Sequence, residues 1–126
     1  MSKLLKGLFL LAAVLGFLTG APLLLAPERA LGLLAWDVVD PLITRLLGAA
    51  LLALAWGSLR AYLSAERERM QALAEVNAVF TILGALGFLR HLLTGSYYPP
   101  VIWVIFAALA LFALAWVFAL VRLRAS

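Results

Sequence analysis

Charged side chains interrupt the two central apolar segments of this chain, and they are the residues best able to do chemistry. Arg60 closes one segment and Glu75 opens the next, with Asn77 two residues later. A helical hairpin would bring Arg60 and Glu75 together, and pairing lowers the free-energy cost of holding both charges near lipid. This inner cluster is either a proton or cation site centred on Glu75 or a salt bridge that fixes the hairpin. Asn77 lies about 200° around the helix from Glu75, so it faces elsewhere.

A second cluster is expected at the opposite ends of the same two segments. It combines cations and carboxylates from both segments: Arg45, Arg90, His91, Asp37 and Asp40. Such a cluster either binds an anionic ligand or lipid headgroup between the helices or is a set of side chains that extend to the membrane interface. His91 is a candidate pH-sensitive group, a candidate haem or chlorophyll ligand, or an ordinary interfacial residue.

Residues for known catalytic chemistry are missing. The chain has no cysteine, which excludes disulfides, thiolate nucleophiles and zinc–thiolate sites, and its single histidine cannot build a metal site alone. No serine has a base beside it, and no metal-binding or phosphate-loop motif is present. We therefore expect no metal and no cofactor, and a non-catalytic role is favoured without excluding an enzyme.

Composition indicates where these residues are held. Of the 126 residues, 67% are hydrophobic and 13% are charged. A soluble domain is about 45–50% apolar and about 25% charged. The chain is therefore expected to be one integral membrane domain over residues 1–126, and its dispersed basic residues give no reason to expect a nucleic-acid partner.

Four apolar segments predict an all-α fold. The expected architecture is a four-helix up-down transmembrane bundle with helices at about 4–26, 42–63, 72–93 and 101–122. The two central segments have 14-residue uncharged runs that span only about 21 Å, so charge must lie inside both rims of the membrane. Asp40 and Pro41 form a helix start, residues 64–71 a charged turn, and residues 27–40 contain a short interfacial helix between helices one and two.

Small residues mark the faces expected to pack. Ala12, Gly16 and Gly20 recur every four residues in the first helix, as do Ala49, Ala53 and Gly57 in the second. The third helix carries a stripe with heptad spacing that should face the bundle, formed by Asn77, Thr81, Gly84, Phe88 and His91.

The distribution of basic residues predicts orientation. With four spans, both termini share one side, and that side holds seven of the ten Lys and Arg residues. Because cytoplasmic loops carry the excess of positive charge, both termini are expected in the cytoplasm. The Leu-, Ala- and Arg-rich composition suggests a bacterial source, and hence the bacterial cytoplasmic membrane.

One segment carries a resemblance to known proteins. Residues 45–54, with the sequence RLLGAALLAL, resemble the start of helix two in a broad group of small uncharacterised four-helix bacterial membrane proteins. The preceding residues 26–29, with the sequence APER, resemble the proline-containing stretch after helix one in the same group. The resemblance implies a four-helix bundle and no particular activity.

These observations favour a non-catalytic membrane subunit or scaffold. Its partners would be the lipid bilayer and either a larger membrane complex or further copies of the chain. The alternatives are a small oligomeric transporter or channel, with the charged residues lining the passage, and a lipid- or quinone-binding protein that uses the outer cluster.

Orientation can be tested by cysteine labelling, because the chain has no native cysteine. Tyr98→Cys should react with a membrane-impermeant maleimide in intact cells. Glu68→Cys should react only after the cells are permeabilised, since residues 64–71 are expected in the cytoplasm. The reverse pattern would contradict the predicted orientation.

Overall fold

The computed structural model describes residues 3–33, 40–94 and 100–125, and these form five α-helices. They are α1 (Lys3–Leu25), α2 (Pro27–Leu33), α3 (Pro41–Leu63), α4 (Arg67–Leu93) and α5 (Val101–Ala125). No strand occurs in the described part of the chain. The four longer helices are long and apolar enough to cross a membrane, as in a multi-pass membrane protein.

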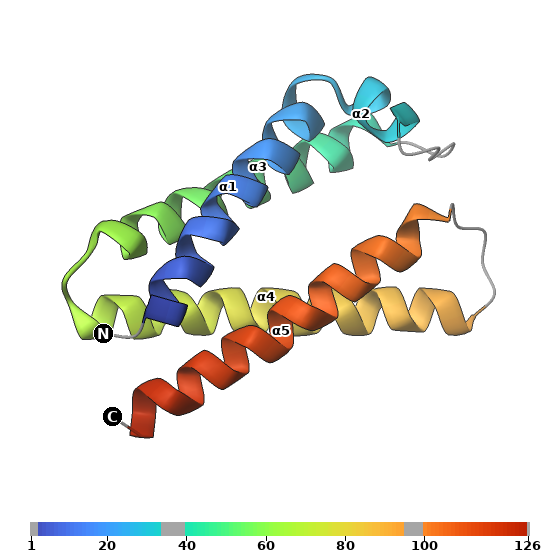
Figure 1. Ribbon diagram of the computed structural model, residues 1–126. Helices are drawn as coiled ribbons and strands as arrows, with labels where there is room; N and C mark the ends of the chain where they lie inside the picture. The colour runs from blue at the N-terminus through green and yellow to red at the C-terminus, as the bar shows by residue number, and fades with distance from the viewer. Residues whose placement is uncertain (1–2, 34–39, 95–99, 126) are drawn as a thin grey trace.

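The long helices form two antiparallel hairpins. α1 packs along α3, and α4 packs against α5, whereas contacts between the two hairpins are fewer. Figure 1 shows the start of α1, the end of α5 and the turn that joins α3 to α4 on the same side of the molecule. We call this the termini end, and the opposite side the α2 end. The expected four-helix up-down bundle with one short additional helix is confirmed.

The expected helix boundaries agree within a few residues, with one larger difference. Residues 64–71 were expected to form a charged turn, but α4 already begins at Arg67, so the turn is only 64–66. The charged residues of this segment are good helix formers. The negative charge of Glu68 in the first turn stabilises the helix, because it lies at the positive end of the helix dipole. The charge of this segment therefore does not end the helix.

The start of α3 follows its capping chemistry. Asp40 has extended backbone, and its Oδ1 accepts hydrogen bonds from the backbone N–H groups of Leu42 at 3.1 Å and Ile43 at 3.2 Å. Pro41 at the first helical position has no N–H to leave unsatisfied. The expected Asp–Pro helix start is confirmed.

Glycines bring α1 and α3 into backbone contact. A Cβ atom added to Gly48 would lie 2.6 Å from the backbone nitrogen of Leu24 and 2.7 Å from the carbonyl oxygen of Gly20. One added to Gly16 would lie 2.7 Å from the Cβ of Ala55. The predicted small-residue face of the first helix therefore packs as expected, through Gly16 and Gly20.

The face predicted for the second helix was wrong. Ala49 and Ala53 are exposed. Gly57 lies near Leu73, so it faces α4 and not α1. The residues of α3 buried along its length are Thr44, Gly48, Ala55, Ser58 and Ala61. Both sets contain small residues, so only the partner helix decides which set is used.

The side chains shared by both hairpins gather near the termini end. Phe9 of α1 and Trp116 of α5 are almost completely buried, with ring centroids 5.0 Å apart. Around them lie further buried residues from all four long helices, namely Leu5, Leu8, Ala61, Met70, Ala74, Ala78, Ala119 and Leu123. Every member belongs to the half of its helix nearer the termini end, so the two hairpins share a core over only part of their length.

The backbone contact can be tested at Gly48. Gly48→Ala should destabilise the fold by about 1–3 kcal/mol, because its new methyl group overlaps the backbone of α1. Reversible unfolding in detergent micelles measures the change. Gly7→Ala is the matched control, since an added Cβ there meets no atom within 4 Å. Equal stability of the two variants would contradict the close packing.

Candidate functional site

A lysine from the start of α1 binds the end of α3. Lys6 Nζ donates hydrogen bonds to the carbonyl oxygens of Tyr62 at 2.7 Å and Ser64 at 2.8 Å, and it lies 5.8 Å from the centroid of the Tyr62 ring. The last carbonyls of a helix lack partners within that helix and carry its partial negative charge. Lys6 therefore supplies both donors and a complementary charge.

Arginines repeat this arrangement at two further helix ends. Arg45, near the start of α3, donates from Nη1 to the carbonyl oxygen of Leu24 in the last turn of α1, at 2.9 Å. Arg67, the first residue of α4, donates to the carbonyl oxygen of Leu123 near the end of α5. In each hairpin, a cation at a helix start thus binds the helix end beside it.

These capping cations were missed at the level of sequence. Lys6 and Arg67 are among the basic residues that predict the membrane orientation, and Arg45 belongs to the predicted outer cluster. The available signal was a basic residue in the first two turns of a helix, where the helix's own dipole disfavours it. In an antiparallel hairpin that position lies beside the partner's C-terminus, which favours it.

The inner cluster forms differently from the expectation. Glu75 pairs with Arg124 of α5, with 3.5 Å between Oε1 and Nη2, and Oε1 also accepts a 3.4 Å hydrogen bond from Gln71. Arg60 is exposed and forms no ion pair with Glu75, so the predicted hairpin bridge was wrong. The physical reason is that α4 packs mainly on α5, which places the end of α5 beside Glu75.

Asn77 joins the hairpins through a separate polar contact. Its Nδ2 donates to Ser58 Oγ at 3.1 Å and to the Leu73 carbonyl at 3.1 Å. One turn later, Thr81 Oγ1 donates to the carbonyl of Asn77 at 2.9 Å. The side chains of Ser58, Asn77 and Thr81 are all buried. The prediction that the stripe containing Asn77 and Thr81 faces the bundle is confirmed for these two residues. As expected, Asn77 does not share a face with Glu75.

The outer cluster is not assembled as one site. Asp40 is engaged at its helix start and Arg45 at the end of α1, while Arg90 is exposed. Figure 1 shows the start of α3 well separated from the end of α4, which carries Arg90 and His91. The first alternative, an anion site between these helices, is therefore not supported, because the hairpins diverge toward the α2 end. The second alternative, separate side chains that extend to the membrane interface, stays a prediction. Asp37 lies outside the described residues.

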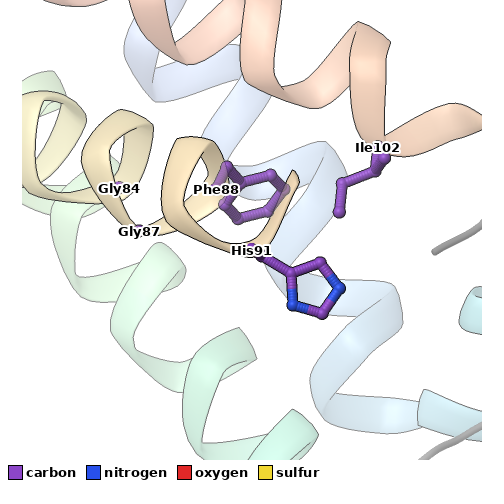
Figure 2. Close-up of a pocket in the computed structure, with 5 residues that line it drawn as sticks. All are labelled: Gly84, Gly87, Phe88, His91 and Ile102. Carbon is purple, nitrogen blue, oxygen red and sulfur yellow. The ribbon is translucent and has the colours of Figure 1, made fainter. Parts of the chain in front are cut away.

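His91 instead lines an open pocket between α4 and α5. The pocket has a volume of about 380 Å³ and is lined by Gly84, Gly87, Phe88, His91 and Ile102. Figure 2 shows Phe88 and His91 side by side on α4, with Ile102 approaching them from α5. Phe88 and Gly84 belong to the predicted stripe, so this half of the stripe faces α5 and the pocket.

The chemistry available to these residues is binding and packing. Among the described residues, no group of three or more His, Asp or Glu side chains could hold a metal ion. The capping cations and the Asn77–Ser58 pair are committed to contacts within the fold. Glu75 has a side chain 46% exposed, beside Arg124.

Comparison with protein-family models, curated proteins and solved structures returned no match for this chain. The resemblance of residues 45–54 to small bacterial membrane proteins therefore stays a prediction.

Helix capping by Lys6 can be tested by Lys6→Met, which keeps the side-chain length and removes the charge. We expect a loss of about 2 kcal/mol in the free energy of unfolding, since two charge-assisted hydrogen bonds disappear. Unfolding in detergent micelles measures it. Lys3→Met is the matched control, because Lys3 is exposed on the same helix. A loss of similar size in both variants would show that net charge, and not capping, is responsible.

Proposed function

We propose that this protein is a non-catalytic membrane subunit or scaffold that packs against a larger membrane complex or against copies of itself. The observation that carries this proposal is that the two hairpins pack against each other over only part of their length. Their shared core lies near the termini end. Toward the α2 end, each hairpin is held mainly by contacts between its own two helices.

The surface left by this arrangement is large and apolar. Within the most apolar stretch of each span, only 17–22% of the residues are buried inside the protein. At mid-length, a hollow of about 130 Å³ is lined by all four long helices, with Leu15, Leu54, Phe80 and Leu109 each from a different one. A second membrane protein could bury such a surface by van der Waals packing, which is the main source of helix association in lipid.

The geometry favours a scaffold over a transporter. A transport pathway needs polar groups near the middle of the membrane. Ser58, Asn77 and Thr81, which are buried polar side chains of α3 and α4, bind each other or nearby backbone carbonyls. Glu75 lies near one end of α4, where its partner Arg124 is 68% exposed.

We further propose that the protein resides in the bacterial cytoplasmic membrane with both termini in the cytoplasm. The supporting observation is that the termini and the α3–α4 turn share one end of the molecule (Figure 1), so the basic residues of these segments act together in the positive-inside effect.

Photo-crosslinking in the native membrane tests the scaffold. Benzoylphenylalanine replaces Phe80, which lines the hollow, or Phe118, which is 54% exposed near the termini end. We expect protein adducts from position 80 and mainly lipid adducts from position 118. An adduct of twice the chain mass indicates self-association, and any other mass indicates a different subunit.

Two results would contradict the scaffold. One is the absence of protein adducts at position 80 together with a monomer in nanodiscs. The other is ion or solute flux in reconstituted vesicles that disappears in Glu75→Gln, since a scaffold has no such dependence. We expect Glu75→Gln to change unfolding by less than about 1 kcal/mol, because its ion pair is largely exposed.

A further inference from the structure

The pocket between α4 and α5 has the size of a small-molecule site. Its volume of about 380 Å³ falls within the roughly 300–1,000 Å³ typical of ligand pockets. It is formed by side chains and backbone of two helices that pack directly on each other, and Ile102 at its wall is 2% exposed. The described walls of the pocket therefore belong to packed helices.

Polarity changes along the length of the pocket. His91 lies three residues before the C-cap of α4 at Thr94, whereas Gly84 lies about 10 Å deeper along the helix. Among the lining residues that the structure describes, all except His91 are apolar or glycine, and none carries a carboxylate, ammonium or guanidinium group. The matching ligand is a neutral amphiphile whose polar group lies near the membrane boundary and whose tail extends inward.

The walls favour a flat headgroup. Gly87 has no side chain, and a Cβ added there would meet no atom within 4 Å, so its backbone leaves open space. Phe88 provides an aromatic ring in the same pocket (Figure 2). Aromatic rings pack favourably in offset or tilted pairs. An imidazole has two ring nitrogens, so one N–H can be donated to a ligand carbonyl while the other nitrogen bonds elsewhere.

We propose that this pocket binds a membrane quinone. The ring packs against Phe88 and the glycine surface of α4, a carbonyl oxygen accepts a hydrogen bond from His91, and the isoprenoid tail runs past Gly84 into the bilayer. This site is independent of the scaffold function, because it lies within one hairpin and needs no protein partner. Both properties can hold together, and either can fail alone.

Equilibrium binding of a radiolabelled short-chain ubiquinone tests the site. The full-length protein is placed in phosphatidylcholine nanodiscs, and saturable binding of one molecule per chain is expected. Gly87→Leu should abolish that binding by filling the open space. Gly7→Leu is the matched control, since an added Cβ at either glycine meets no atom within 4 Å.

His91→Leu tests the hydrogen bond and remains informative if Gly87→Leu fails to fold. It should weaken binding about tenfold, the effect of one lost hydrogen bond. Circular dichroism and elution as a single species verify folding of each variant. Farnesol, which has a tail and a hydroxyl but no ring, should compete poorly with the quinone.

Three outcomes would overturn the proposal. The first is an absence of saturable binding to the wild-type protein. The second is equal binding by Gly87→Leu and Gly7→Leu, whether retained or lost in both. The third is displacement of the quinone by farnesol at equal concentration, which would assign the pocket to apolar chains in general.

Discussion

The close contact of α1 with α3 is the constraint on which the rest of the structure depends. In a bilayer, apolar side chains gain little by leaving lipid for protein, so helices associate through van der Waals packing and hydrogen bonds. The lack of side chains at Gly20 and Gly48 brings the two backbones into contact. That contact fixes the register of the hairpin, and with it the pairing of Lys6 and Arg45 with the opposite helix ends. The same cations then satisfy carbonyls that lack a partner within their own helix.

Each hairpin is consequently a more complete unit than the bundle. Both hairpins have at least one helix end capped by a cation from the partner helix. Between the hairpins, the described contacts include the core around Phe9 and Trp116 and the Asn77–Ser58 hydrogen bond. Asp40, Arg45 and Asn77, three of the polar residues that looked suitable for chemistry, are used for architecture. The exposed apolar surfaces and the α4–α5 pocket are where the two proposed properties would reside.

The distinction between a rim charge and a functional charge rests on what each side chain contacts. Arg45 and Arg90 each lie at one end of a central apolar segment, so their positions in the sequence do not distinguish them. In the structure, Arg45 binds the end of α1, and Arg90 is exposed. His91, next to Arg90 in sequence, lines a pocket because successive helical residues point about 100° apart. A cluster inferred from the expected position of its residues at one end of two helices is thus divided among three different environments.

Sequence alone determined the properties that depend on local composition. Apolar run lengths predicted four long helices, Asp40 and Pro41 predicted the start of α3, and heptad spacing predicted the buried face containing Asn77 and Thr81. Only the tertiary structure decided which helices pair, because nearly every face of these helices is apolar enough for either lipid or protein. It selected Gly48 over Ala49 as the contact with α1, and Arg124 over Arg60 as the partner of Glu75. Such choices depend on backbone distances between helices, which hydropathy and spacing within one helix do not encode.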